Sequence, residues 1–176
     1  MTNKEMVRQH LDGLNVPYAW HEHAAANTMA DCLALPYAAP DVTFCKNILL
    51  CNRQKTQYYL YITLPDKPFR TADVSKLLGV SRLSFAPEET LEELCRLHRG
   101  SLSPFALWFD PDRRITFAVD RAIRREGRIA FHPCDNTATV IFRQEDFFGR
   151  VVPALAHDPV WLEVPWPQTA GGQADG

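Results

Sequence analysis

A single α+β domain is the fold class that the sequence predicts. The chain has 176 residues, of which 46% are apolar and 23% are charged, the size and balance of one ordinary globular domain with a full core. Apolar patterns of helical and strand type alternate along the whole chain, and several strands are spaced as hairpins, as in α+β proteins. We expect the domain to span residues 1–166, followed by a disordered tail at residues 167–176, which are rich in glycine and polar residues.

Capping residues and apolar runs define the elements of the first half. Thr2 and Glu5 have the spacing of a capping box for a first helix, and Asn27 or Thr28 can cap a short second helix. Two more helices are expected, one that Thr71 caps and Gly79 ends, and one that starts at Pro87 and is followed by Gly100. The expected strands are residues 43–51 and 57–63, which form a hairpin, and residues 82–85.

The second half continues with the same mixture of patterns. Residues 105–109 and 115–119 flank a polar turn, and their spacing predicts an antiparallel hairpin. An amphipathic helix is expected at residues 145–156, although Pro153 must kink or shorten it. The remaining expected strands are residues 129–131, 137–142 and 160–164.

Net charge and cysteine usage narrow the class of protein. A net charge of −2 argues against a generally basic nucleic-acid coat, so a nucleic-acid partner would have to meet a local patch. The five cysteines form no CxxC pair, which favours free buried thiols over a disulfide framework, a zinc ribbon or a redox pair. Residues 1–10 hold no signal-peptide core, and no apolar run is long enough to span a membrane. We expect a cytoplasmic protein, and a monomer because no element carries an exposed apolar stripe.

Two residues are candidates for chemistry on their own. Lys46 interrupts an apolar run, so it is either a strand-end lysine that faces solvent or a cleft lysine that binds a phosphate or polarises a carbonyl. His132 is followed by Pro133, which favours an extended backbone and helps to fix the direction of the ring. Taken alone, such a histidine is more often a hydrogen-bonded or surface residue than a catalyst. Asn136 is either a turn residue or a residue that bonds to a ligand.

A glycine loop and two histidines leave further alternatives. Gly100 opens a serine-rich loop that ends at Pro104, which is either an ordinary connection or a backbone that can approach an oxyanion closely. Ser101 has no GxSxG setting, so a serine-hydrolase triad has little support. His21 and His23 lack a third ligand at a recognisable spacing, so no metal site is expected.

One basic cluster stands out from the slightly acidic chain. It is either a solvated helix face or a patch that binds nucleic-acid phosphates. Its members are Arg121, Arg124, Arg125 and Arg128.

In their order and spacing, four segments resemble the YbaK/prolyl-tRNA-synthetase-associated domain family. They are residues 45–50, 78–86, 100–105 and 131–136, and the resemblance extends over about residues 3–164. It implies a mixed, mostly antiparallel β-barrel-like sheet surrounded by helices, and hydrolysis of the ester that joins a wrong amino acid to the 3′-terminal adenosine of tRNA, without a cofactor or metal. Glu22 and His23, and the Ser-Pro-Phe after the glycine loop, resemble the branch that acts on alanyl-tRNA(Pro).

The resemblance also implies roles for individual residues. Lys46 would hold a terminal phosphate or the ester carbonyl, backbone N–H groups near Gly100 would cradle the carbonyl oxygen, and His132 would orient the substrate; with Asn47 these are the candidate catalytic residues. The candidate substrate-binding residues are Ser101, Pro104, Asn136, Thr43 and His23, and the four arginines are the candidate tRNA-binding residues. Two departures from the family pattern, Cys45 and the segment 24–27, could line the amino-acid pocket.

Partners and rival functions follow from the same comparison. The implied partner is tRNA(Pro) mischarged at its 3′ end, with prolyl-tRNA synthetase or an elongation factor as further candidates. One alternative is a deacylase of the same fold for cysteinyl-, seryl- or threonyl-tRNA. Another is a non-catalytic module that binds tRNA or a synthetase. A thiol-based redox protein is disfavoured because no cysteine pair has redox spacing.

Overall fold

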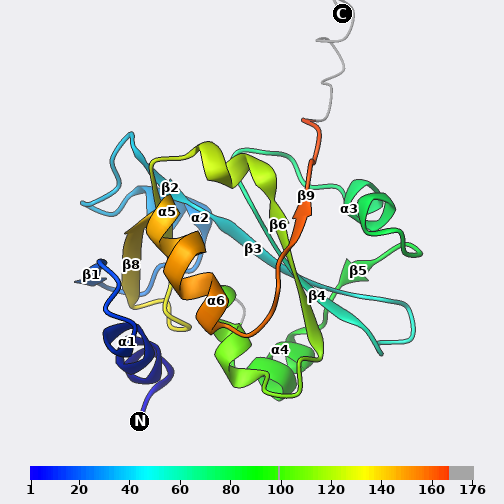
Figure 1. The fold of residues 1–176 in the computed structure, drawn as a ribbon, viewed down its shortest axis with the longest axis horizontal. Helices are drawn as coiled ribbons and strands as arrows, with labels where there is room; N and C mark the ends of the chain where they lie inside the picture. Colours follow the sequence, from blue (N-terminus) through cyan, green and yellow to red (C-terminus); the bar gives the residue numbers. More distant parts are fainter. Residues whose placement is uncertain (99, 167–176) are drawn as a thin grey trace, which may run out of the picture.

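The computed structural model describes residues 1–98 and 100–166, so the predicted tail at residues 167–176 lies outside the described residues. Within them, nine strands form two open sheets flanked by helices, and these strands close no barrel (Figure 1). Four of the seven strand pairings are antiparallel and three are parallel. The predicted α+β class with a mixed, mostly antiparallel arrangement is therefore confirmed.

The first sheet has four strands in the order β1-β8-β7-β2. β8 pairs antiparallel with both β1 and β7, whereas β2 runs parallel to β7. Its strands are β1 (Ala19–Glu22), β2 (Val42–Phe44), β7 (Arg128–Phe131) and β8 (Ala138–Arg143).

The second sheet has five strands in the order β5-β3-β4-β6-β9. β3 and β4 form the predicted antiparallel hairpin, with Lys46 opposite Thr63. β6 runs parallel to both β4 and β9. The strands are β3 (Lys46–Cys51), β4 (Tyr58–Thr63), β5 (Ser84–Phe85), β6 (Ile115–Asp120) and β9 (Val160–Leu162).

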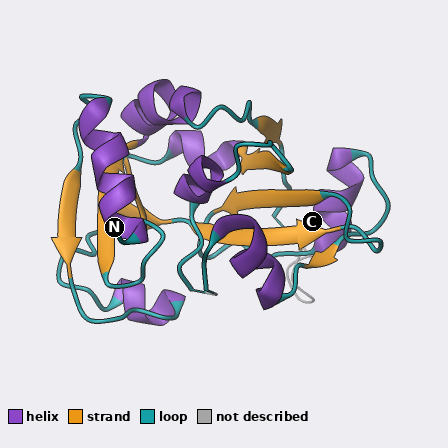
Figure 2. Cartoon of the chain, turned by 90° about the horizontal axis from the view of Figure 1, so that it is seen from below, coloured by secondary structure: helices purple, strands orange, loops and turns teal. Residues whose placement is uncertain are grey.

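Helices surround the two sheets (Figure 2). The side chain of Thr2 accepts from the Glu5 backbone and Glu5 bonds back to the Thr2 backbone, so the predicted capping box is confirmed. Thr28 caps the second helix in the same way, which confirms the second of the two predicted caps. The α-helices are α1 (Asn3–Gly13), α2 (Met29–Leu33), α3 (Thr71–Leu78), α4 (Glu88–Cys95), α5 (Gln144–Asp146) and α6 (Val152–Ala154).

The predicted hairpin of residues 105–109 and 115–119 is wrong. Pro104–Phe109 forms the 3₁₀ helix η1, with Pro104 in its first turn, where a missing N–H costs least. β6 then pairs with β4 and β9, both parallel to it and distant in sequence. Long-range pairing therefore overrides the local turn between the two segments, a contact that spacing alone does not reveal.

The predicted helix at residues 145–156 is interrupted. α5 continues into a π-helical segment, η3 (Phe147–Val151), before α6 begins at Val152. Pro153 has no N–H to donate to the preceding turn, which explains why regular α-helical bonding fails there. Two predicted helix starts shift by one residue, since the cap before α3 is Arg70 and the cap before α4 is Pro87.

The predicted strand at residues 43–51 is divided between the two sheets. β2 ends at Phe44 and β3 begins at Lys46, so the chain passes from one sheet to the other at Cys45. The Cys45 N–H donates to the carbonyl of Ala130 at the end of β7. This crossing places the first residues of β3 beside the end of β7, where most of the predicted catalytic residues lie.

The core and the cysteines follow the expectations from composition. The largest apolar cluster includes Leu49, Leu60 and Phe105, and a second cluster on the other face of the five-stranded sheet includes Ile48 and Tyr61. All five cysteines are free and buried. Among the described residues, no helix has both the length and the apolar character needed to cross a membrane.

Candidate functional site

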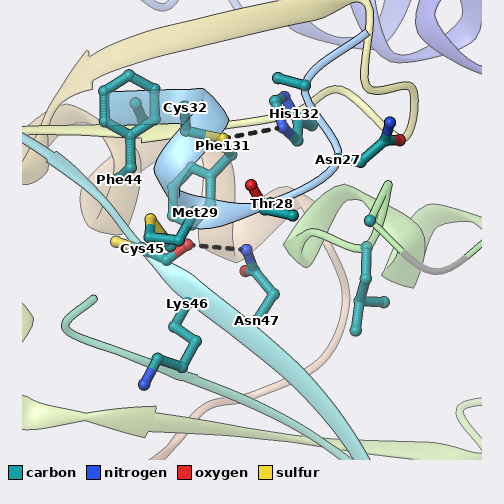
Figure 3. A pocket seen from close by; sticks show the side chains of 14 residues that line it. Asn27, Thr28, Met29, Cys32, Phe44, Cys45, Lys46, Asn47, Phe131 and His132 are labelled. Carbon is teal, nitrogen blue, oxygen red and sulfur yellow. Dashed lines mark hydrogen bonds between the residues drawn. The ribbon is translucent and has the colours of Figure 1, made fainter. Parts of the chain in front are cut away.

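A cavity of about 210 Å³ lies at the crossing between the two sheets. Its walls come from α2 and the loop before it, the β2–β3 crossing, the end of β7 and the loop after α4 (Figure 3). The four residues predicted as catalytic all contribute to this lining: Lys46, Asn47, Gly100 and His132. The topology thus brings together residues that are up to 86 positions apart in sequence, from 46 to 132.

His132 occupies the position directly after β7, and its ring is held from both sides. Nδ1 lies 2.9 Å from the carbonyl oxygen of Ala138, which can only accept, so Nδ1 carries the proton. Nε2 lies 3.4 Å from Sγ of Cys32 on α2 (Figure 3). Burial lowers the pKa of the His132 imidazole, so the ring is neutral at pH 7 and Nε2 is an acceptor.

Cys32 is a hydrogen-bond donor in this site and not a thiolate. Burial raises the pKa of its thiol, so at neutral pH the S–H group points its proton to Nε2 of His132. A cysteine nucleophile requires a lowered pKa. The pair therefore differs from a catalytic Cys–His dyad, and the thiol forms part of the cavity wall.

Lys46 and Asn47 lie next to each other on β3 and point to opposite sides of the strand (Figure 3). The ammonium group of Lys46 turns away from His132 and donates to the Lys67 carbonyl at 3.0 Å. Burial lowers the pKa of this ammonium. Asn47 donates through Nδ2 to the Cys45 carbonyl at 3.1 Å, whereas its buried Oδ1 has no hydrogen-bond partner among the described residues. This oxygen is therefore a buried acceptor left unpaired in the described part of the chain, on a residue that lines the cavity.

A buried ion pair supports the carbonyl that binds Lys46. Nζ of Lys67 lies 2.8 Å from Oδ2 of Asp120, and the two side chains are 2% and 1% exposed. Thr63 donates to the same carboxylate oxygen at 2.7 Å, and the Val164 carbonyl accepts from Lys67 at 2.8 Å. The ion pair fixes residue 67, so its backbone carbonyl stays in place below Lys46.

Gly100 adopts a backbone conformation that favours glycine. Its φ is +93°, and a Cβ at this position would lie 3.3 Å from the carbonyl oxygen of Asn27. The loop after α4 therefore packs directly against the segment before α2, and both segments line the cavity. The close approach seen here is to the backbone of Asn27, and the approach of this loop to a substrate oxyanion stays a prediction.

Replacing Gly100 with alanine is expected to destabilise the fold by about 1–2 kcal/mol, because an L-residue is strained at positive φ and the added Cβ presses on Asn27. Urea unfolding followed by circular dichroism measures the change. Gly149→Ala is the matched control, since a Cβ there meets nothing within 4 Å. Equal midpoints for the two variants would contradict the account of this loop.

Two of the predicted substrate-binding residues lie behind the cavity lining. His23 bonds through Nε2 to the hydroxyl of Thr139 at 2.8 Å, and its ring centroid is 5.9 Å from that of His132. Asn136 donates to the side-chain oxygen of Asn27, which itself lines the cavity. His23 thus lies beside His132, and Asn136 beside Asn27, both of which line the cavity. The roles of His23 and Asn136 in substrate binding stay predictions.

The other three lie in supporting positions. Thr43 donates to the carboxylate of Glu126, away from the lining residues. Ser101 is 8% exposed, and Pro104 begins η1 and is buried. Between them, Leu102 lines the cavity. The loop thus contributes to the site through Gly100 and Leu102, while the contact of these three residues with substrate stays a prediction.

Two of the four predicted tRNA-binding arginines are paired with carboxylates. Arg128 makes a bidentate bond to Asp41, at 2.7 and 2.9 Å. Arg121 lies 3.0 Å from Glu163. Their charges are therefore partly offset, which lowers their value as phosphate ligands.

The other two arginines, Arg124 and Arg125, are also exposed. The Arg124 guanidinium lies 5.3 Å from the ring centroid of Phe148 and 5.8 Å from that of Trp161. Arg125 is exposed. Both belong to the 3₁₀ helix η2 (Arg121–Arg125), so the predicted cluster is a short helical turn followed by a strand residue. Its role in binding tRNA stays a prediction.

Sequence reasoning missed several residues of the cavity wall, among them Met29, Cys32 and Phe44. Met29 and Cys32 lie three positions apart on α2, so one face of this short helix meets the cavity. Phe44 ends β2. The capping box at Thr28 predicted the helix but not the direction of its face. The departures noted from the family pattern do reach the cavity: Ala26, Asn27 and Cys45 line it.

The chain has relatives among known proteins. Residues 23–149 match the aminoacyl-tRNA editing domain family. The prolyl-tRNA editing protein ProX of Acetoanaerobium sticklandii is 29% identical over 146 residues, which cover 83% of this chain and 88% of that protein. Prolyl-tRNA synthetase associated domain-containing protein 1 of Mus musculus is 35% identical over 121 residues, which cover 66% of this chain and 70% of that protein.

A solved structure has the same fold. It is the crystal structure of a candidate trans-editing enzyme for prolyl tRNA synthetase, with a TM-score of 0.67 over 94% of this chain and 99% of that chain. Its sequence identity of 14% limits the likeness to the arrangement of helices and strands.

Proposed function

Because the chain belongs to the aminoacyl-tRNA editing domain family, and is thus an aminoacyl-tRNA deacylase, we propose that it hydrolyses mischarged tRNA(Pro) in trans, with alanyl-tRNA(Pro) as its substrate. The observation that carries the proposal is the cavity at the sheet crossing, where Lys46, Asn47, Gly100 and His132 meet. The printed names of ProX and of the mouse relative, which refer to prolyl-tRNA and its synthetase, support the choice of tRNA.

The reaction is ester hydrolysis, and the site supplies positioning and charge stabilisation. Water adds to the ester carbonyl, the bond from the carbonyl carbon to the ribose oxygen breaks, and the ribose hydroxyl leaves with a proton from that water. Backbone N–H groups of the Gly100 loop stabilise the oxyanion. Oδ1 of Asn47, which has no hydrogen-bond partner among the described residues, accepts from the substrate amino group, and Nε2 of His132 accepts from a substrate or water hydroxyl in place of the Cys32 thiol.

The position of Lys46 favours one of its two expected roles. Its ammonium lies on the opposite side of β3 from Asn47 and bonds to the Lys67 carbonyl. A phosphate of the tRNA 3′ end that passes over the edge of β3 would reach this ammonium, whereas the ester carbonyl would lie on the Asn47 side. We therefore assign Lys46 to phosphate binding.

The limit on discrimination by the synthetase supports alanine as the substrate. Met29, Cys32 and Phe44 form an apolar part of the cavity wall, which suits an alanine methyl group. A synthetase site built for proline cannot strongly exclude alanine, because a missing methylene is worth only about 1–3 kcal/mol. Hydrolysis in a second, smaller pocket supplies the missing discrimination.

The pH dependence should report His132. Because burial lowers the pKa of this imidazole below its usual value of about 6.5, kcat/KM is expected to fall on acidification only below about 6.5, as Nε2 gains a proton. The unfolded chain binds that proton more readily, so stability should also fall as the pH drops below about 6.5. Deacylation rates and urea midpoints measured from pH 5 to 8 test this. In His132→Gln the acid-dependent part of the stability should shrink, and an unchanged slope would contradict the assignment.

A panel of mischarged tRNA(Pro) species tests the proposed function. The species carry alanine, cysteine, serine or threonine, with prolyl-tRNA(Pro) as control, and are incubated with wild-type protein and with Lys46→Ala. Rapid hydrolysis of the alanyl ester by wild type alone is the expected result. Preference for another amino acid would retain the enzyme class and replace the substrate. Survival of every ester would favour a non-catalytic tRNA- or synthetase-binding module.

The remaining partners follow from the substrate. A trans-acting deacylase must reach the mischarged tRNA before it enters the ribosome, so prolyl-tRNA synthetase or an elongation factor is the expected meeting point. The cytoplasm is the compartment that this substrate implies, and the five free cysteines are consistent with it. A monomer is the expected state.

A further inference from the structure

Three cavities lie in a row along one edge of the five-stranded sheet. The second, of about 480 Å³, shares Asn47, Gly100 and Leu102 with the cavity described above. The third, of about 560 Å³, shares Phe85 with the second. The shared residues place the three cavities in order from the site of hydrolysis, by way of β3 and β5, to the start of α3. Figure 1 shows these three elements.

The second cavity has a mostly apolar lining. Apart from Asn47 and Gly100, its lining residues are apolar: Ile48, Leu49, Phe85, Ala86, Leu91 and Leu102. β5 pairs with β3 only at Leu50 and Cys51, so in the described part of the chain the first residues of β3 meet no strand on this side. The cavity is therefore open along the edge of the sheet, immediately beside the reaction site.

Phe85 forms the far wall of this cavity and is unusually exposed for a phenylalanine. Its exposed fraction is 60%, and Phe69 supports its ring at a centroid distance of 5.5 Å and an interplanar angle of 68°. A supported, exposed aromatic ring is a platform on which nucleic-acid bases stack.

The third cavity, on the other side of Phe85, is basic. Arg70 and Arg82 line it, against the single carboxylate of Asp73. An apolar cavity, an aromatic platform and two guanidinium groups in this order match the end of a single-stranded RNA, in which bases stack and phosphates follow at regular intervals.

We propose that the second cavity binds the adenine base at the 3′ end of tRNA, stacked against Phe85, and that the preceding phosphates pass toward Arg70 and Arg82. This subsite rests on the proposed function, since it uses the continuity of the two cavities at Asn47 and Gly100. With the ester in the first cavity, the ribose lies between them and the base enters the second. The second cavity thereby holds the nucleotide, and the first cavity contacts only the amino acid.

A fluorescent RNA end tests the subsite without any hydrolysis. The probe is an uncharged ribo-oligonucleotide ending in CCA, in which 2-aminopurine replaces the terminal adenine. Stacking on Phe85 is expected to quench its emission when wild-type protein is added. Phe85→Leu should weaken binding by at least about fivefold, the lower limit for loss of one base–aromatic stack, and reduce the quench. Phe85→Tyr should retain both.

Matched variants distinguish the contribution of base stacking to binding from that of the phosphate contacts. Arg82→Gln and Arg70→Gln should weaken binding and flatten its salt dependence while the quench of bound probe persists. Val160→Ala, an exposed apolar position on β9 at the opposite edge of the same sheet, should bind as wild type does. Equal affinity and quench for wild type and Phe85→Leu would overturn the proposal. So would a wild-type dimer that Phe85→Leu dissociates and that excludes the probe, since a second copy would then occupy the cavity.

Parallel deacylation assays keep this inference distinct from the proposed function. Protein that hydrolyses alanyl-tRNA(Pro) but binds the probe independently of Phe85 would overturn the subsite alone. Protein that quenches the probe through Phe85 but hydrolyses no ester would support the subsite and overturn the deacylase. Because Phe85 is exposed, Phe85→Leu is expected to fold as wild type does, and thermal unfolding checks this.

Discussion

His132→Ala is expected to lower kcat/KM for alanyl-tRNA(Pro) hydrolysis by about 100- to 1000-fold, the cost of one positioned hydrogen-bonding group in a site of this kind. The imidazole is held by the Ala138 carbonyl through Nδ1 and presents Nε2 to the cavity beside Cys32. Alanine removes this acceptor and leaves the backbone in place. Single-turnover deacylation with purified mischarged tRNA measures the loss.

The control for this variant is His21→Ala. His21 lies on β1 of the same sheet and stacks on Tyr37 at a centroid distance of 3.9 Å, and it does not line the cavity. Its removal should leave the rate near that of wild type. A His132→Ala protein that folds normally and keeps its rate within a few-fold of wild type would show that Nε2 takes no part in hydrolysis.

Asp120→Ala is expected to destabilise the protein by about 3–5 kcal/mol, because it leaves the ammonium of Lys67 buried without its carboxylate. The carboxylate also accepts from Thr63 and from the Ala122 N–H, so these donors lose their partner as well. Urea denaturation at constant pH measures the change in the free energy of unfolding. The same variant should lower deacylation, because the Lys67 carbonyl that binds Lys46 would lose its support.

Two comparisons isolate the buried charge in this result. Asp112→Asn, at an exposed turn position, should change stability by no more than about 0.5 kcal/mol. The double variant Lys67→Met with Asp120→Leu should recover much of the lost stability, because no unpaired charge remains in the interior. An Asp120→Ala protein as stable as wild type would contradict the account of this ion pair.

Local patterns predicted the elements that local forces determine. The capping box of Thr2 and Glu5 and the cap at Thr28 could be predicted because each uses a hydrogen bond between residues three positions apart. The β3–β4 hairpin could be predicted for a similar reason, because two apolar runs flank a polar turn. These contacts form between neighbours in sequence, so spacing is sufficient to find them.

Features that depend on contacts between distant segments could not be predicted from spacing. The parallel pairing of β6 with β4 and β9 cannot be read from the turn before β6, and so residues 105–109 were predicted as a strand. The split of residues 43–51 at Cys45 depends on the Ala130 carbonyl of another strand. Both features are set by tertiary packing, which overrides local propensity.

Four members of the candidate site were predicted from the sequence, but its geometry was not. Resemblance selected Lys46, Asn47, Gly100 and His132, and the structure gathers them around one cavity. The direction of the Lys46 ammonium, away from His132, depends on the alternation of side chains along β3 and on the carbonyl of Lys67. Met29 and Cys32 were missed because which face of α2 meets the cavity is decided by elements far from it in sequence.

The most direct test of the central claim compares two esters on one tRNA. Single-turnover hydrolysis of alanyl-tRNA(Pro) and prolyl-tRNA(Pro) is measured with wild type and with Lys46→Ala. The proposed function predicts that wild type hydrolyses the alanyl ester far faster than buffer does and leaves the prolyl ester at its spontaneous rate, and that Lys46→Ala loses most of this activity. Hydrolysis of both esters at equal rates, or of neither above the rate in buffer, would contradict it.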